Sequence, residues 1–241
     1  LSRYQAAFGR AILGMNPAIQ TVVKKVGGHV GQFRVQKYRV IAGVRTMVTE
    51  HRESGVRLKL DLSKVYFSPR LGHERLRVAG LVRPGERALV IGSGSGPYPL
   101  VIAKHSKATQ VVGVEVNPAA HRFAVENARL NKLESRVSFV RGDAKRVVPK
   151  LGEFDRVLIT APYQSGVLLK VALSVLKGRG WLHYYSFAGE GEFKDAVYAL
   201  KQAILANHRT CGLVSVVRCG QKSPGVWRVC LETCVSGRKS R

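Results

Sequence analysis

A regular alternation of short apolar segments with amphipathic ones, starting near residue 85, constrains the fold of this chain more than any other feature. Short apolar runs rich in Val and Ile predict buried strands, and the longer segments between them have helical spacing. Strands that alternate with helices build a parallel sheet covered by helices on both faces. The predicted strands are 88–91, 110–116, 137–141, 156–159 and 180–187, and the predicted helices are 100–105, 117–130, 168–176 and 193–207.

The C-terminal part of the chain has a different pattern. Residues 211–219 and 226–235 predict two strands, and the Ser-Pro-Gly sequence at 223–225 predicts a turn between them. Such a hairpin adds antiparallel strands to a parallel sheet. The expected fold class is therefore α/β: a Rossmann-like, mostly parallel seven-stranded sheet with an antiparallel terminal hairpin, over residues 61–236, followed by a basic tail at 237–241.

Residues 1–60 do not show this alternation. Runs of β-branched residues at 19–23, 39–44 and 57–62, with glycines between them, predict a small β-rich domain in front of the sheet. The chain starts with Leu, so we expect an N-terminal segment to precede it. No run of about 18 or more apolar residues occurs, so the sequence predicts no membrane helix.

Positive charge is the strongest compositional signal. The chain has 40 Lys and Arg against 15 Asp and Glu, a net charge of +25 that is spread over its N-terminal, central and C-terminal parts. Such a surface gains free energy from counterion release when it binds a polyphosphate. Solubility alone needs far less charge, and no basic amphipathic helix or lipidation signal points to an anionic membrane. RNA is the expected partner.

The four cysteines are Cys211, Cys219, Cys230 and Cys234, and their spacings do not form the paired C-x-x-C clusters of a structural zinc site. Cys230 and Cys234 have the same parity in a predicted strand, so we expect both to face the same layer. The pattern predicts buried free thiols and no metal, which is typical of a reducing compartment.

A candidate ligand-binding loop follows the first predicted strand. Gly92, Gly94 and Gly96 stand between that strand and a helix, where glycine lets the backbone approach a ligand and exposes N–H groups. Glu115 ends the next strand, where a carboxylate can accept hydrogen bonds from both hydroxyls of a ribose. Asp143 follows the third strand, where it can accept from an adenine amino group.

These three elements lie at the same edge of the predicted sheet. Ligands of parallel sheets bind beyond the carboxyl ends of the strands, and each element follows a strand there. The combination predicts a site for an adenosine-containing cofactor. Taken singly, Glu115 or Asp143 could instead be a helix N-cap or a first-turn acid.

Further motifs run through nearly the whole chain. They are Asn16-Pro17 through Lys25, Gln32-Phe33-Arg34, Phe67-Ser68-Pro69-Arg70-Leu71 with Glu74-Arg75, Gly94-Ser95-Gly96-Pro97-Tyr98, Glu115-Val116-Asn117-Pro118, Gly142-Asp143-Ala144, His183-Tyr184-Tyr185 and Ser223-Pro224-Gly225-Val226-Trp227. In this order they resemble the archaeal and eukaryotic tRNA (guanosine-37 N1) methyltransferases. The resemblance implies a class I methyltransferase fold that uses S-adenosyl-L-methionine (AdoMet) on RNA. The related wybutosine-pathway enzyme, an aminocarboxypropyl transferase, usually departs from Ser-Pro-Arg-Leu, which favours methyl transfer here.

The resemblance implies roles for the matched positions. Glu74 would be the general base that takes the N1 proton of guanine, Arg34 would orient the base and this carboxylate, and Asn117 would support the pocket. Cofactor contacts would also come from Pro97, Tyr98, Val116 and Ala144. From the residues alone, Glu74 could be an ion-paired surface acid and Arg34 a phosphate contact, because sequence does not show whether a base reaches its proton.

Three positions depart from the family pattern. The family has Asn-x-Pro after the fourth strand, where this chain has Thr160, Ala161 and Pro162, and Thr lacks the paired donor and acceptor of an amide. Val90 replaces the usual acid at the end of the first strand, and Glu115 replaces Asp. Thr160 and Pro162 remain candidate catalytic positions.

Two functions follow as alternatives. The first is an AdoMet-dependent RNA methyltransferase, most like the tRNA guanine-N1 enzymes and placed in the mitochondrial matrix by its extreme basicity. The second is a methyltransferase-like RNA-binding factor of mitochondrial ribosome assembly or structure, with weakened catalysis. Glu74, Arg34 and Asp143 favour the first alternative, whereas Val90 and Thr160 favour the second. The family markers disfavour a nucleotide-binding oxidoreductase.

RNA affinity should fall steeply with salt, because each phosphate contact made by Lys or Arg releases condensed counterions. In a filter-binding titration with tRNA, the logarithm of the association constant plotted against that of the salt concentration should have a slope of about −4 or steeper, as for roughly six phosphate contacts. A slope near zero would contradict the assignment of RNA as the partner.

Overall fold

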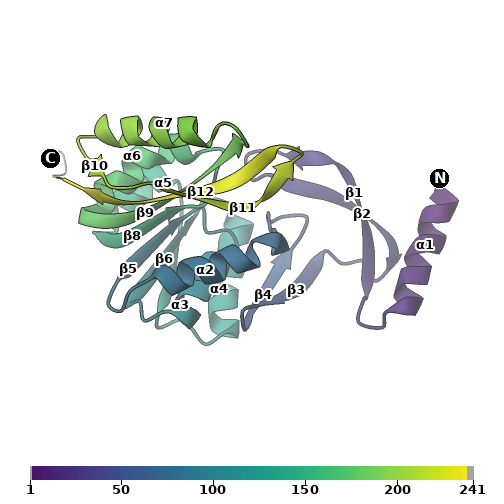
Figure 1. The fold of residues 1–241 in the computed structure, drawn as a ribbon. Helices are drawn as coiled ribbons and strands as arrows, with labels where there is room; N and C mark the ends of the chain where they lie inside the picture. Colours follow the sequence, from purple (N-terminus) through teal and green to yellow (C-terminus); the bar gives the residue numbers. More distant parts are fainter. Residues whose placement is uncertain (1, 238–241) are drawn as a thin grey trace.

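The computed structural model describes residues 2–237, and its centre is an eight-stranded sheet (Figure 1). The strand order is β10-β12-β9-β8-β5-β6-β7, and β11 also pairs with β12. Strands β5 to β9 are parallel, while β12 is antiparallel to β9, β10 and β11. The strands are β5 (Arg87–Ile91), β6 (Gln110–Glu115), β7 (Val137–Arg141), β8 (Phe154–Ile159), β9 (Leu176–Gly189), β10 (Thr210–Cys211), β11 (Ser215–Ser223) and β12 (Val226–Ser236).

Helices cover both faces of this sheet, as Figure 1 shows. On one face lie α2 (Gly72–Leu81), α3 (Pro97–His105) and α4 (Pro118–Leu130), and on the other α5 (Ala144–Val147), α6 (Ser165–Val175) and α7 (Phe193–Leu205). Short 3-10 turns, η1 (Pro69–Leu71) and η2 (Val148–Lys150), precede α2 and follow α5. Each face has its own apolar core, with Leu168 and Leu200 in one and Val78 and Leu100 in the other.

The predicted sheet, mostly parallel with antiparallel strands at the C-terminal end, is confirmed. One segment differs: residues 211–219 do not form a single strand. The chain leaves the ladder at residues 212–214, where Val214 is buried in the core, and both β10 and β11 pair with the long strand β12. The two-residue strand β10 makes the sheet eight-stranded rather than seven-stranded.

The N-terminal part consists of α1 (Ser2–Met15) packed on a hairpin of β1 (Thr21–Val30) and β2 (Val35–Gly43). The predicted β-rich character is present, but the sequence did not predict α1. This helix packs so close to β2 that a Cβ atom at Gly9 would stand only 2.7 Å from the Cβ of Ala42. Across residues 2–237, no helix has both the length and the apolar character needed to cross a membrane.

A second hairpin, β3 (Val48–Glu53) and β4 (Val56–Asp61), pairs only with itself among the described strands. Alternate side chains of β4 are fully buried in the same core as α2 and α3; they are Val56, Leu58 and Leu60. The hairpin therefore packs with the large sheet. The sequence pattern assigns residues 1–60, and thus nearly all of this hairpin, to the small N-terminal domain. Of the basic tail suggested at 237–241, residues 238–241 lie outside the described residues.

Asn127 on α4 fastens this second hairpin and the glycine loop to the same helix. Its side chain is fully buried; Oδ1 accepts from the Lys59 N–H at 2.7 Å, and Nδ2 donates to the carbonyls of Lys59 at 2.9 Å and Ser95 at 3.0 Å. One turn later, Asn131 makes the equivalent pair of bonds to Arg57 at a half-buried position.

Asn127→Ala should lower the free energy of unfolding by about 2–4 kcal/mol, because it leaves three backbone groups without partners, a buried one at Ser95 and two part-buried ones at Lys59. Asn131→Ala, the matched control, should cost about 1 kcal/mol because water replaces the lost bonds to Arg57. Urea denaturation of both variants measures the two values. Equal losses would show that Asn127 does not fasten the loop.

Candidate functional site

A cavity of about 740 Å³ opens beyond the C-terminal ends of the central strands. Ten of the residues singled out from the sequence line it: Arg34, Gly92, Gly94, Glu115, Val116, Asn117, Asp143, Ala144, Thr160 and Pro162. Four do not line it: Glu74, Gly96, Pro97 and Tyr98. The structure thus brings the glycine loop, Glu115 and Asp143 to one shared space.

The three loop glycines have left-handed backbone conformations but different surroundings. A Cβ on Gly94 (φ 58°) would meet only the carbonyl oxygen of Tyr66, at 4.0 Å, so the loop presents bare backbone to the cavity. Gly96 (φ 91°) instead lies against the core, where a Cβ would stand 2.8 Å from Cζ of Phe139. Pro97 and Tyr98 follow it into α3 and are buried in the core. Packing therefore accounts for these three positions.

Glu115 joins the glycine loop to the turn after β6. Its Oε2 accepts from the backbone N–H of Gly94 at 2.7 Å, and its Oε1 from that of Asn117 at 2.7 Å. Burial raises the pKa of this carboxyl, although the backbone hydrogen bonds oppose the shift. Because each carboxylate oxygen has a second lone pair, Glu115 can still accept from a ligand in the cavity.

Asp143 and Asn117 are both helix N-caps at the rim of the cavity. Asp143 accepts from the N–H of Lys145 at 2.9 Å at the start of α5, and its side chain is exposed. Asn117 accepts from the N–H of Ala119 at 3.0 Å at the start of α4 and donates to the Lys64 carbonyl at 2.8 Å. The N-cap interpretation is thus correct for Asp143, and it coexists with a place in the cavity wall.

Thr160 supports the loop rather than offering a donor to the cavity. Its hydroxyl donates to the backbone carbonyls of Gly92 at 2.7 Å and Ile91 at 3.1 Å. A threonine hydroxyl has a single hydrogen, and these carbonyls occupy it. Nearby, Pro162 also lines the cavity.

Cationic and aromatic side chains form a lip at the other end of the cavity. Arg34, in the turn between β1 and β2, stacks on the ring of Tyr163, with its guanidinium carbon 3.8 Å from the ring centroid. The Tyr163 and Phe187 rings lie 4.8 Å apart, and the Lys222 ammonium stands 4.5 Å from the Phe187 centroid. Stacked rings beside cations are typical of surfaces that hold unpaired bases. No motif in the sequence pointed to Phe187 or Lys222.

The structure does not bring Glu74 to the cavity. This side chain is 4% exposed on α2, where Oε1 accepts from the Tyr185 hydroxyl at 2.6 Å and both oxygens accept from Arg77, at 2.7 and 2.9 Å. The interpretation of Glu74 as an ion-paired acid is confirmed, except that Glu74 is buried and its partner Arg77 half-buried rather than both lying on the surface. The geometry does not support a direct role for Glu74 as the base. Tyr185 is 111 residues away in sequence, so no local pattern could reveal this contact.

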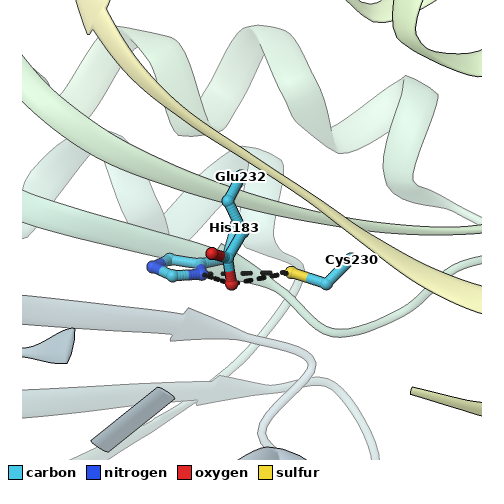
Figure 2. A group of neighbouring side chains, drawn as sticks. All are labelled: His183, Cys230 and Glu232. Carbon is cyan, nitrogen blue, oxygen red and sulfur yellow. Dashed lines mark hydrogen bonds and ion pairs between the residues drawn. The ribbon is translucent and has the colours of Figure 1, made fainter. Parts of the chain in front are cut away.

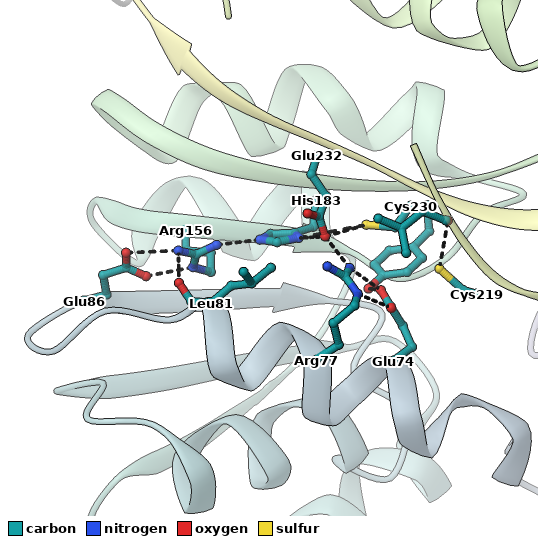
Figure 3. Close-up of polar contacts among 11 residues, drawn as sticks. Glu74, Arg77, Leu81, Glu86, Arg156, His183, Cys219, Cys230 and Glu232 are labelled. Atoms are coloured by element: carbon teal, nitrogen blue, oxygen red, sulfur yellow. Dashed lines mark hydrogen bonds and ion pairs between the residues drawn. The ribbon is translucent and has the colours of Figure 1, made fainter. Parts of the chain in front are cut away.

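Glu74 belongs to an interior network of polar side chains (Figure 3). Arg77 links it to Glu232 on β12, and Glu232 contacts Nδ1 of His183 on β9 at 3.2 Å. Nε2 of His183 lies 2.6 Å from Arg156 on β8. Arg156 ends this network in an ion pair with Glu86 at 2.7 Å.

The protonation states of His183 and Glu232 in this network follow from the donors around them. Arg156 can only donate, so Nε2 of His183 accepts and Nδ1 carries the proton toward Glu232. Burial lowers the pKa of His183, which keeps the ring neutral. Burial opposes ionisation of Glu232, but hydrogen bonds from His183 and Arg77 win and lower the pKa of Glu232 to about 2. The network is therefore held together by satisfied ion pairs and hydrogen bonds.

His183, Cys230 and Glu232 converge closely enough to suggest a metal site (Figure 2). The Cys230 sulfur lies 3.7 Å from Glu232 Oε1 and 3.9 Å from His183 Nδ1. Guanidinium groups of Arg77 and Arg156 contact this cluster directly, and burial raises the pKa of the Cys230 thiol well above its usual value. Two adjacent cations and a protonated thiol oppose binding of a metal ion. The three residues are better explained as part of the polar network described above.

All four cysteines are free. Cys230 is buried as expected, whereas Cys211, Cys219 and Cys234 are half-buried.

The fold and the cavity define the class of protein: a class I methyltransferase-like α/β protein in which a glycine loop, Glu115 and Asp143 converge at the edge of a parallel sheet. Residues 49–214 match the TRM5/TYW2 methyltransferase domain. The chain belongs to the TRM5/TYW2 methyltransferase family.

Two relatives illustrate the similarity. The tRNA (guanine(37)-N(1))-methyltransferase Trm5b of Pyrococcus abyssi is 36% identical over 192 residues, which are 80% of this chain and 56% of that protein. The tRNA(Phe) (4-demethylwyosine(37)-C(7)) aminocarboxypropyltransferase of Pyrococcus horikoshii is 32% identical over 216 residues, 89% of this chain and 76% of that protein. The chain thus spans little more than half the length of Trm5b.

Solved structures agree with this assignment. The crystal structure of Pyrococcus abyssi Trm5b superposes with a TM-score of 0.86 at 30% identity, covering 97% of this chain and 69% of that one. The structure of P. horikoshii TYW2 in complex with MeSAdo gives a TM-score of 0.84 at 27% identity, covering 97% and 84%.

Replacement of Glu115 should weaken binding of AdoMet. Glu115→Gln should reduce the affinity at least about tenfold, because a charged acceptor of the ribose hydroxyls is lost. For the unmodified chain, affinity should fall on acidification with a midpoint above pH 4.5, since burial raises the pKa of this carboxyl and its protonated form accepts poorly. Isothermal titration calorimetry at several pH values measures both effects.

Glu126→Gln is the matched control for that titration, because Glu126 lies on α4, the helix that follows β6, pairs with Lys59 and does not line the cavity. Its affinity and pH profile should match the unmodified chain. An unchanged acid limb in Glu115→Gln would exclude this carboxylate as the titrating group.

Proposed function

We propose that this chain binds AdoMet in the cavity and transfers its methyl group to N1 of a guanine in tRNA. The observation that carries the proposal is the convergence of bare glycine backbone, Glu115 and Asp143 in one cavity, with the cationic and aromatic lip at its other end. Membership of the TRM5/TYW2 family supports the choice of cofactor and of tRNA as substrate. The net charge of +25 supports RNA binding.

The residues that would hold AdoMet follow from the strand order. Asp143 after β7 would accept from the adenine amino group, and Glu115 after β6 from the ribose hydroxyls. The backbone at Gly92 and Gly94 would face the methionine part. AdoMet supplies an electrophilic methyl group. The substrate half, beside Thr160 and the lip, would hold guanine so that N1 bonds to the methyl carbon as the carbon–sulfur bond breaks, and the N1 proton leaves to solvent.

A methyltransferase-like RNA-binding factor is the second candidate, and one observation favours it. The carboxylates that line the cavity, Glu115 and Asp143, stand on the cofactor side, while Glu74 is occupied by Arg77 and Tyr185. A protein in this arrangement could bind RNA with weakened chemistry, for example in mitochondrial ribosome assembly. For either candidate we propose the mitochondrial matrix as the location, supported by the large basic excess.

Transfer of tritium from methyl-labelled AdoMet separates the two candidates. We expect label in a tRNA with guanosine at position 37 and none in the same tRNA with adenosine there, with N1-methylguanosine identified by mass spectrometry. Calorimetry with AdoMet alone is the companion measurement. Two results would reject the methyltransferase and leave the RNA-binding factor: tight RNA binding without label transfer, or tight RNA binding with an AdoMet dissociation constant in the millimolar range or weaker.

A further inference from the structure

One buried arginine at the cavity lacks the partners that the other buried arginines have. Arg228 on β12 is 8% exposed and lines the cavity. Its Nη2 donates to the backbone carbonyl of Thr160 at 3.0 Å, while its buried Nε has no hydrogen-bond partner. Among residues 2–237, no carboxylate forms an ion pair with it.

The other deeply buried arginines have more partners, although Nε of Arg75, like that of Arg228, has no hydrogen-bond partner. Arg75 pairs with Glu53 at 2.6 Å and Arg156 with Glu86 at 2.7 Å. Arg209 has no carboxylate, but it donates to several backbone carbonyls, including that of Lys177 at 2.7 Å. Arg228 has fewer partners than these three, namely one carbonyl and the Tyr185 ring, whose centroid lies 5.1 Å from its guanidinium carbon. A buried charge with few partners is costly, so its persistence at a cavity indicates a ligand that supplies further acceptors.

The sheet order shows which half of the cavity Arg228 serves. Glu115 ends β6, and β5, β8 and β9 stand between β6 and β12. At about 4.8 Å per strand, four steps separate Arg228 from Glu115 by about 19 Å. Arg228 is instead paired across the ladder with Phe187, which forms the aromatic lip with Tyr163. The ligand of Arg228 therefore lies in the substrate half of the cavity, not in the adenosine half.

We infer that Arg228 selects the target base by donating hydrogen bonds to O6 and N7 of guanine. With one Nη2 hydrogen held by Thr160, the guanidinium keeps Nη1 and the second Nη2 hydrogen for the ligand. A guanidinium fork matches the paired acceptors of guanine, whereas adenine places a donor, its amino group, at the position of O6. The Thr160 hydroxyl is already engaged, so Arg228 supplies these donors. The inference rests on the proposed function for the presence of guanine.

The test compares base analogues in an anticodon stem-loop RNA, in the presence of S-adenosylhomocysteine so that no transfer occurs. Position 37 carries guanosine, inosine, 7-deazaguanosine or 2-aminopurine riboside. Inosine keeps O6 and N7, 7-deazaguanosine lacks N7, and 2-aminopurine lacks O6. Fluorescence anisotropy should show similar affinity for guanosine and inosine, and at least about fivefold weaker binding of each of the other two RNAs.

Two variants test the residue. Arg228→Gln and Arg228→Lys should both bind the four RNAs with nearly equal affinity; the lysine keeps the charge but loses the fork. Arg218→Gln, the matched control, removes an exposed charge from the neighbouring strand β11 and should keep the discrimination. Thermal denaturation identifies any variant that is not folded.

Three outcomes would overturn the inference: no discrimination by the unmodified chain, full discrimination by a folded Arg228 variant, or loss of AdoMet affinity in Arg228→Lys with discrimination intact, which would assign Arg228 to the cofactor. These results are independent of label transfer. A chain that discriminates through Arg228 but transfers no methyl group would reject the proposed methyltransferase activity while upholding base selection.

Discussion

The cavity depends on one carboxylate that fixes the glycine loop. Glu115 accepts backbone N–H groups from Gly94 and Asn117, and so joins the loop after β5 to the turn after β6. From the other side, the buried amide of Asn127 holds the Ser95 carbonyl and the edge of β4. Since these contacts end on backbone atoms, they set the position of the loop whatever side chains surround it. The open space beside the loop follows from that position.

Charge is distributed unevenly between the interior and the cavity. In the interior, Glu74 and Glu232 share the guanidinium of Arg77 in a continuous polar network with His183. At the cavity, Arg228 keeps donors without acceptors. A low-dielectric interior strengthens paired charges and penalises unpaired ones, so the first arrangement stabilises the fold and the second is suited to a ligand. Burial by itself therefore did not separate structural from ligand-binding ionisable groups; their partners did.

The sequence predicted the large sheet well because its strands and helices carry strong periodic signals. The segments 110–116 and 117–130 appear as β6 and α4, with Asn117 as the N-cap and Pro118 in the first turn. Periodicity failed where a contact distant in sequence decides the structure. Helix α1 is held by β2, and the segment 211–219 is divided because two parts of it pair with one long strand.

By itself, the sequence determined the fold class, the family and the glycine and acid positions that line the cavity, because these depend on local spacing along successive strands. Only the tertiary structure decided which chemical groups face the cavity. It assigned Gly96 to packing against Phe139, enclosed Glu74 between Arg77 and Tyr185, and left Arg228 open beside Phe187. The physical reason is that the partner which satisfies a charge, or fails to, comes from strands far apart in the chain, and no local pattern records it.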